Sequence, residues 1–310
     1  MIYLFTTIIG SFILDHKLQL IHFQQFKDIT EFQEKEKGEA QLRKKYQQLQ
    51  PLPPEKYPLA LAMLKNKQYF SLFHQQNMAL TKQAISSSVN EDNLIIQTIS
   101  NIRELDSVTN LLSKRLREWH SLYYPELSHQ IASNDAFVKL ILSKSKTELM
   151  KELHQKQSIG AALDKRHCDQ ILHLAQQIAN LYALRENHEQ YLEKVMTKYC
   201  PNLLALAGVT IGAKLIELAK SLKRLALLPA STIQLLGAEK ALFRHLRTKA
   251  KSPKHGIIVN HPLVQKASRK ERGKAARRLA DKLSLCARLD YFKGAFKAEE
   301  YQHELEKALA

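Results

Sequence analysis

The beginning of the chain is rich in aromatic and β-branched side chains, which favour β-strands. These residues run from Ile2 to Ile9 and again from Phe12 to Phe23, and Gly10 with Ser11 separates the two runs. A short polar break between two such runs is typical of a hairpin turn. The pattern therefore predicts a buried β-hairpin with strands Ile2–Ile9 and Phe12–Phe23.

A helix-prone stretch of mixed charge follows over residues 35–50, and prolines then break the chain at Pro51, Pro53 and Pro54. Strands followed by a short helical stretch indicate a small α/β domain, which we assign to residues 1–90. The apolar run that opens the chain is shorter than the ~20 residues that a membrane-spanning helix needs. It also has no positively charged start or cleavage pattern, so we expect no secretory signal.

From residue 93 onward the apolar positions recur at steps of three and four, which is the period of an amphipathic helix. A first helix is predicted over Asn93–Tyr124, where Pro125 ends it. A second long helix is predicted over Leu163–Lys198. Their length and balanced charge indicate a helical hairpin or coiled coil over residues 91–200.

One face of the second helix carries a heptad-like seam of apolar residues, interrupted by Arg185 and His188. The seam consists of Ile171, Leu174, Ile178, Leu181, Leu192 and Val195. In a coiled coil these six residues would form the contact of a homodimer. The same pattern also fits two helices that pack inside one bundle, and the sequence leaves both alternatives open.

Pro201 begins a third helical region, which we assign to an all-α domain over residues 201–310. A helix is predicted over Leu203–Lys220, a short segment over Ser231–Leu236 and a new helix after Gly237. The short apolar piece Ile257–Val259 is strand-like. The predicted fold class is thus mainly α, with a small α/β domain at the N-terminus, a central hairpin or coiled coil, and an all-α C-terminal domain.

Charge singles out this last region. The 310 residues include 47 Lys and Arg against 30 Asp and Glu, a formal net charge of +17. Residues 201–310 hold 22 basic and 9 acidic residues, whereas residues 91–200 hold 14 of each. A local surplus of this kind indicates a polyanionic partner, either nucleic acid or an anionic membrane surface. A membrane-binding helix would need a free apolar face beside its lysines, so nucleic acid is favoured.

The surplus is densest after Gly237, a residue that can close the preceding turn and free the backbone for a new helix. Three cations on this helix share one face: Lys240, Arg244 and Arg247. Three apolar residues occupy the adjacent face and are expected to be buried: Leu242, Phe243 and Leu246. Glu239 stands alone among the cations, and we expect it to cap the helix start or to pair with Lys240 or Arg244.

A loop without acidic residues follows, and basic residues resume in the next helix. We predict from the charge pattern that the RNA-binding residues include Lys240, Arg244, Arg247, Lys249, Lys251, Lys254, His255, Arg272 and Lys274. Contacts with phosphates make binding strongly salt-dependent. No zinc finger, basic zipper or RNP aromatic signature is present, so the residues alone leave DNA possible. A surface of loop and helix suits the shape of structured RNA.

The residues give no sign of catalysis or of a bound metal. Phosphate-binding, zinc-protease and serine-hydrolase motifs are absent from the sequence. The three cysteines lie far apart without a C-x-x-C pair, which argues against a disulfide framework or a structural zinc site and fits a reducing compartment. His167 and Cys168 are adjacent without a third ligand, so we expect a packing or surface role for them. We therefore predict a non-enzymatic protein without a cofactor.

Several motifs, in order, resemble the Nop-domain family. They lie at Asn93–Gln97, Leu116–Trp119, Tyr124–Leu127, Cys200–Leu203, Leu228–Gln234, Gly237–Leu246, His255–Ile258, His261-Pro262, Arg272–Ala276 and Ala287–Tyr291. Together they cover about residues 92–292. The likeness is strongest to archaeal Nop proteins of box C/D small ribonucleoproteins, and the spliceosomal Nop-domain protein is a more distant relative.

This resemblance implies a scaffold. In the family, the C-terminal Nop domain binds a kink-turn guide RNA together with a ribosomal-type kink-turn protein, and the central coiled coil forms a homodimer. The N-terminal domain holds fibrillarin, which adds 2′-O-methyl groups to RNA; S-adenosylmethionine would then be bound by fibrillarin. The family's RNA-contacting helix start and loop correspond to Gly237–Arg247 and Lys249–His255, so the resemblance implies that Gly237, Ala238 and Glu239 also bind RNA.

The region before Asn93 departs from the family by being shorter and only loosely similar. The long lysine-rich tail of eukaryotic members is also absent, and a mixed-charge helix over Glu299–Ala310 is expected instead. These features favour an archaeal, cytoplasmic protein. The alternatives are a helical dimer that binds an acidic protein, a splicing-type Nop-domain RNA-binding protein, and an RNA-modifying enzyme.

Overall fold

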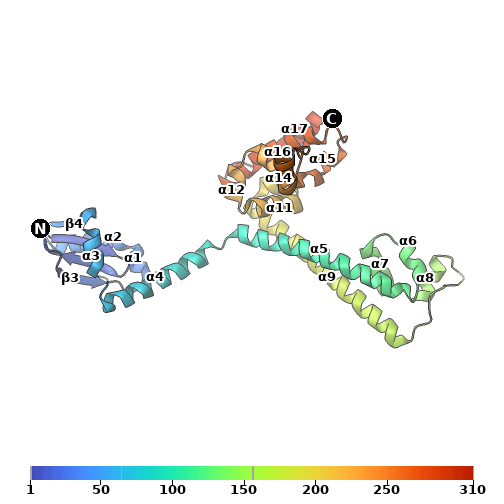
Figure 1. Cartoon of the computed structure of the whole chain (residues 1–310), viewed down its shortest axis with the longest axis horizontal. Coiled ribbons are helices and arrows are strands. Elements are labelled where there is room, and N and C mark those ends of the chain that lie inside the picture. The colour runs from blue at the N-terminus through green and yellow to red at the C-terminus, as the bar shows by residue number, and fades with distance from the viewer. Residues whose placement is uncertain (1, 64, 156, 310) are drawn as a thin grey trace. The chain divides into compact units, whose positions relative to one another are not determined.

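The computed structural model describes residues 2–63, 65–155 and 157–309, and most of them are helical (Figure 1). The chain divides into two compact units, Met1–Asn90 and Glu91–Ala310. The first unit combines a small sheet with helices, and the second is built from helices. This confirms the predicted fold class.

The first unit contains a four-stranded sheet in the order β3-β2-β1-β4. Its strands are β1 (Ile2–Thr7), β2 (Gly10–Leu14), β3 (Leu20–Gln25) and β4 (Leu49–Pro51). β1 and β2 form the predicted antiparallel hairpin, and β4 pairs with β1 in parallel. The helices of this unit are α1 (Ile29–Gln33), α2 (Lys35–Lys45), the 3₁₀ turn η1 (Pro54–Lys56), α3 (Tyr57–Met63) and α4 (Lys67–Ser88).

The second arm of the hairpin is not one strand, as the sequence pattern had predicted, but two. Oδ1 of Asp15 accepts hydrogen bonds from the backbone N–H groups of Lys17 at 2.8 Å and Gln19 at 2.7 Å. Leu18, between them, has a left-handed backbone with φ of +62°. A carboxylate that satisfies two backbone donors stabilises a turn in place of a continuing strand.

In the second unit, α5 (Glu91–Ser121) and α9 (Lys165–Tyr199) pack against each other as the predicted helical hairpin (Figure 1). Three short helices join them at the end of the hairpin: α6 (Pro125–Gln130), α7 (Asn134–Ser143) and α8 (Lys146–Glu152). The core there includes Leu116, Tyr124 and Phe137, all fully buried.

The apolar seam of α9 is largely used inside this hairpin. Ile171, Ile178 and Leu192 are fully buried among residues of the same chain. Leu174 and Val195 are half-buried against the same two cores, and Leu181 is half-buried. Packing within one chain therefore accounts for Ile171, Leu174, Ile178, Leu192 and Val195. Homodimer formation stays a prediction, and the three buried residues are not free to contact a second copy.

The polar interruption of the seam is also explained by contacts within the hairpin. Nε of Arg185 lies 2.6 Å from Oδ1 of Asp106 on α5. The second interrupting residue, His188, places its Nε2 2.9 Å from Nδ2 of Asn101, also on α5. Both polar residues thus face partners on the other helix, which fixes the register of the pair.

The remaining helices form a bundle around α16: α10 (Pro201–Ala207), α11 (Val209–Ala219), α12 (Leu222–Leu227), α13 (Ala230–Leu235), α14 (Glu239–Thr248), α15 (Pro262–Lys266), α16 (Arg272–Tyr291) and α17 (Ala298–Leu309). The predicted helix Leu203–Lys220 is divided at Gly208, which has φ of +75°. The strand-like piece Ile257–Val259 belongs to a 3₁₀ turn, η2 (Ile257–Asn260). Both differences arise where local backbone geometry overrides the apolar pattern.

Among the described residues, no single helix is both long and apolar enough to cross a membrane, and only α10 with α11 qualifies as a pair, bent by 119°. Both helices contribute buried residues to the bundle core.

A buried carboxylate holds the start of α10: Asp290 accepts hydrogen bonds from the backbone N–H groups of Asn202 at 3.0 Å and Leu203 at 2.8 Å.

Candidate nucleic-acid interface

The turn before α14 fixes where the basic helix begins. Gly237 has φ of +85°, a left-handed conformation that favours glycine. A Cβ at this position would lie 2.3 Å from Cγ2 of Ile257, so the turn also requires the absence of a side chain. The Gly237 N–H donates a hydrogen bond to Oε1 of Glu239 at 2.8 Å. Glu239 therefore stabilises the turn that precedes the helix and does not cap the N–H groups of its first turn. In the described part of the chain it also forms no ion pair with Lys240 or Arg244.

The three cations of α14 are exposed on one face of the helix, as its period requires. They are Lys240, Arg244 and Arg247. None of them forms an ion pair with any residue that the structure describes. Side chains that are neither buried nor neutralised keep their full charge toward solvent, which is what contact with phosphates needs.

The apolar face of the same helix is exposed, contrary to the prediction. Phe243 is 64% exposed, Leu246 is 69% exposed and Leu242 is half-buried. No residue of α14 is fully buried. The error has a physical reason: periodicity locates an apolar face on a helix but does not say whether this chain or a partner covers it.

The ends of α14 hold it in place. At its start, the Gly237 turn packs on Ile257. At its end, Lys249 has φ of +55° and its N–H bonds the carbonyl of His245 at 3.0 Å. Nδ1 of His245 also contacts the carbonyl of Ala250. The basic helix is thus fixed by its two turns, with most of its surface open.

The loop after α14 is tied to α13. Nε2 of Gln234 donates to the carbonyl of Lys254 at 2.6 Å, and the Gly256 N–H donates to the carbonyl of Gln234 at 2.7 Å. A Cβ on Gly256 would lie 1.8 Å from the carbonyl oxygen of Leu236, so only glycine permits this approach. The predicted loop cations Lys249, Lys251 and Lys254 are exposed on this fixed backbone, and His255 is half-buried.

The loop also meets the first turn of α16. A Cβ on Gly273 would lie 3.3 Å from Cδ of Lys254, so the lysine stem crosses the backbone there. Arg272 and Lys274 flank Gly273; the first is half-buried and the second is exposed. The structure therefore brings these two α16 residues next to the loop, although about 20 residues of sequence separate Lys254 from Lys274.

In the part of the chain that the structure describes, no group of three or more His, Cys, Asp or Glu side chains is placed to hold a metal ion. The Sγ of Cys168 instead contacts a backbone oxygen, at 3.8 Å from the carbonyl of Leu163.

The exposed cations of α14, of the following loop and of the start of α16 together form the basic face of the protein. Its geometry is suited to binding a polyanion by charge and shape.

A family model described as "snoRNA binding domain, fibrillarin", the Nop model, matches residues 101–310. The chain belongs to the Nop family. An uncharacterized NOP5 family protein of Methanocaldococcus jannaschii is 45% identical over 251 residues, which are 76% of this chain and 60% of that protein. Nucleolar protein 56 of Dictyostelium discoideum is 40% identical over 222 residues, covering 65% of this chain and 41% of the relative.

Nucleolar protein 58 of Candida albicans is 39% identical over 217 residues, covering 65% of this chain and 42% of the relative. This chain thus spans between 41% and 60% of the length of these three relatives. A crystal structure of a fibrillarin/Nop5p complex aligns with 99% of this chain at 23% identity, with a TM-score of 0.45.

In this Nop-family chain, sequence reasoning missed Phe243 and Leu246 as candidate functional residues. One sequence signal could have found them, namely that the apolar face of α14 lies beside three cations on a helix with no other apolar face. A helix with a cationic side and a narrow apolar side can contact two different surfaces, one polyanionic and one apolar. The sequence does not tell which of them is the protein's own core.

Proposed function

We propose that this Nop-family chain is a non-catalytic scaffold of a box C/D ribonucleoprotein. In this proposal residues 201–310 bind a kink-turn guide RNA jointly with a kink-turn protein, and the first unit holds fibrillarin. The observation that carries the proposal is α14: ten residues, none of them fully buried, with exposed cations on one side and exposed apolar side chains on the next.

The two sides of α14 call for two partners. Phosphates of the RNA would meet Lys240 and Arg244, with the loop lysines and the start of α16 extending the contact. The RNA backbone offers little apolar surface to Phe243 and Leu246. Neighbouring exposed apolar side chains of this size are typical of contacts with another protein. A kink-turn protein already bound to the RNA would supply both surfaces at once.

Fibrillarin binding is assigned to the first unit. Exposed apolar side chains occur on α3 and α4 of that unit: Tyr57, Leu59, Leu61 and Phe70. The description of the matching family model includes fibrillarin and so supports a partner of this kind for the chain, although the match covers residues 101–310 and not the first unit. In this proposal fibrillarin binds S-adenosylmethionine and carries out the methyl transfer, and this chain only holds fibrillarin and the RNA in position.

Self-association is proposed for the hairpin. Because the seam of α9 packs largely within the chain, a second copy would use apolar side chains that remain exposed on α5 and α9. These are Val108, Leu111, Leu184 and Tyr191. Sedimentation equilibrium of the chain tests this proposal: a dimer that Leu111→Glu converts to a monomer supports it, and a monomer at all concentrations contradicts it.

The experiment for the main proposal is a gel-shift titration with a box C/D kink-turn RNA at two salt concentrations, with and without the kink-turn protein. We expect tight, salt-sensitive binding that requires the kink-turn protein. Absence of binding in all four conditions would contradict the proposal. A complex that nuclease leaves intact would indicate an acidic protein partner instead.

A further inference from the structure

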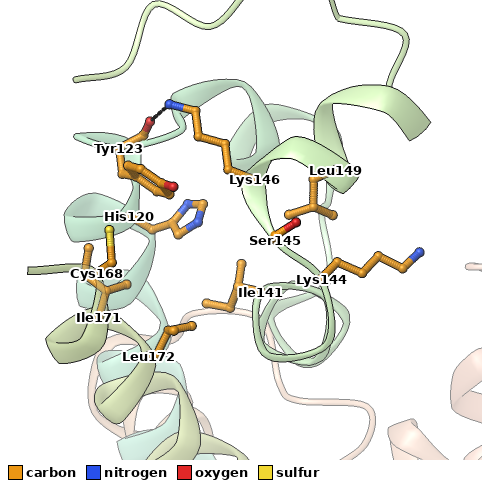
Figure 2. Close-up of a pocket in the computed structure, with 10 residues that line it drawn as sticks. All are labelled: His120, Tyr123, Ile141, Lys144, Ser145, Lys146, Leu149, Cys168, Ile171 and Leu172. Atoms are coloured by element: carbon orange, nitrogen blue, oxygen red, sulfur yellow. Dashed lines mark hydrogen bonds between the residues drawn. The ribbon is translucent and has the colours of Figure 1, made fainter. Parts of the chain in front are cut away.

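The end of the helical hairpin contains a cavity of about 210 Å³ that belongs to no surface described so far. It lies between the C-terminal end of α5 and the helices α7, α8 and α9, as Figure 2 shows. Its walls are largely apolar, with Ile141, Leu149 and Ile171 among them. A cavity of ~150 Å³ with such walls takes up benzene, so this one has room for a single planar ring system.

One buried polar atom of a residue that lines the cavity has no partner. His120 is only 6% exposed, and its Nδ1 makes no hydrogen bond. Figure 2 shows the imidazole pointing from α5 into the space between Tyr123 and Ile141. Burial lowers the pKa of His120 to about 4, so the ring is neutral at pH 7. A neutral imidazole carries its single proton on one nitrogen, and with that proton on Nε2 the unpartnered Nδ1 is an acceptor.

A buried acceptor without a donor costs free energy, and a ligand that supplies the donor recovers it. The ring of His120 is held by aromatic neighbours, with edge-on contacts to Phe137 at 5.4 Å and to Tyr123 at 6.1 Å between centroids. The acceptor therefore has a fixed direction. The matching group on a ligand is an N–H or O–H at the edge of a planar ring.

Two lysines, Lys144 and Lys146, line the cavity, and we call the edge beside Lys146 its mouth. Nζ of Lys146 donates to the carbonyl of Tyr123 at 2.6 Å and lies 4.4 Å from the centre of the Tyr123 ring. An ammonium group has three donors, so two remain for an anion. Lys144 also lines the cavity and pairs with Glu152. An anionic group at the mouth would thus meet Lys146.

We propose that this cavity binds a nucleotide, with the base inside, a base N–H on Nδ1 of His120 and the phosphate on Lys146. The three requirements are a planar ring, a donor at its edge and an anion beyond it, and a nucleotide meets all of them. Apolar and aromatic walls are common partners of bases removed from a stack. The same chemistry occurs in a free mononucleotide and in an unpaired nucleotide of an RNA strand. This site goes beyond the proposed function and does not involve α14.

Cys168 provides a readout at the site itself. It lines the cavity and is half-buried, whereas Cys200 and Cys286 are fully buried. The rate at which N-ethylmaleimide modifies Cys168 in the full chain therefore reports whether the cavity is filled. The probes are AMP, GMP, CMP, UMP, a single-stranded oligoribonucleotide and ribose 5-phosphate, which has the anion but lacks the base.

We expect at least one nucleotide probe to slow the modification about fivefold or more at saturation, and ribose 5-phosphate to have no effect. Protection by mononucleotides identifies a free nucleotide as the ligand, and protection by the oligonucleotide alone identifies an RNA strand. No protection by any probe, or equal protection by ribose 5-phosphate, overturns the proposal. Calorimetric titration of the same probes gives a second readout that does not depend on the thiol.

Variants separate the two polar contacts. His120→Phe keeps an aromatic ring and removes the acceptor, and Lys146→Gln removes the charge at the mouth; each should weaken nucleotide binding about tenfold. Lys151→Gln, on the same helix as Lys146 but outside the cavity lining, is the matched control and should bind normally. Lys240→Ala should also leave protection unchanged, which distinguishes this site from the basic face. Unaltered binding in both His120→Phe and Lys146→Gln overturns the assignment.

Discussion

The backbone N–H of Gly237 donates a hydrogen bond of 2.8 Å to the carboxylate of Glu239, two residues further along the chain. The basic segment 237–278 contains two acids, Glu239 and Glu271, and this contact binds the first of them to the turn before α14. The carboxylate thereby orders the start of α14, where Lys240 follows directly. Glu239, although it is an acid among cations, thus has a structural role in the basic helix.

The turn should tolerate no side chain at Gly237. Gly237→Ala places a Cβ on a left-handed backbone and against Ile257, which should lower the free energy of unfolding by about 1–3 kcal/mol. Urea unfolding of the two proteins measures the difference. Gly38→Ala is the control, because a Cβ there meets nothing within 4 Å and should not destabilise the chain.

The cations of α14 should act through phosphate contacts. Lys240→Ala and Arg244→Ala should each weaken binding of the kink-turn complex by about 1–3 kcal/mol and reduce the slope of log affinity against log salt by about one. Titrations at several salt concentrations measure both quantities. Lys194→Ala, an exposed lysine on α9, should change neither. Equal affinity of the Lys240→Ala and unsubstituted proteins at matched salt would show that the helix faces away from the RNA.

Stability should depend on pH through His120. Its folded pKa, about 4, lies below the ordinary value of 6.5, because burial disfavours the charged ring. The unfolded chain therefore binds the proton more readily, so the stabilisation is complete above pH 6.5 and is lost as the pH falls toward 4. The full effect is about 3 kcal/mol.

The difference between the unsubstituted protein and His120→Phe isolates this effect. Urea unfolding at pH 7 and at pH 4.5 should show a loss of stability on acidification that is about 2–3 kcal/mol smaller in the variant. Asp290 acts in the opposite direction, because burial raises its pKa, so ionising it in the folded state costs free energy as the pH rises. Its contribution is common to both proteins and cancels. Identical pH profiles would mean that His120 titrates normally.

Asp290 should also prove important to the bundle. Its two carboxylate oxygens accept N–H groups of Asn202 and Leu203 in a buried setting. Asp290→Asn keeps the shape but replaces one acceptor by a donor, so a buried N–H loses its partner and stability should fall by about 1–3 kcal/mol. Asp281→Asn, an exposed carboxylate on α16, is the control, and its melting temperature should stay close to that of the unsubstituted protein.

Much of the helical architecture could be predicted from the sequence because long helices leave a clear period. α5 and α9 begin and end within three residues of the predicted Asn93–Tyr124 and Leu163–Lys198. The features that escaped prediction depend on single local contacts. The carboxylate of Asp15 turns one predicted strand into two, and the left-handed Gly208 divides one predicted helix.

The candidate site was predictable in its charge but not in its apolar part. The spacing of Lys240 and Arg244 fixes them on one face whatever the tertiary structure. The burial of Phe243 depends on what lies beside α14, which a period does not encode. The cavity at His120 was likewise invisible, because its lining comes from four helices and its defining feature is the lack of a partner for one nitrogen.

The central claim is that α14 meets RNA with one side and a kink-turn protein with the other. The most direct measurement compares Phe243→Ser/Leu246→Ser with Lys240→Ala/Arg244→Ala in gel-shift titrations on a box C/D kink-turn RNA, with and without the kink-turn protein. The account predicts that the apolar variant binds more weakly in the presence of the kink-turn protein but keeps the salt slope of the unsubstituted protein, whereas the charge variant loses affinity and salt dependence together. Full binding by the apolar variant in the presence of the kink-turn protein would contradict it.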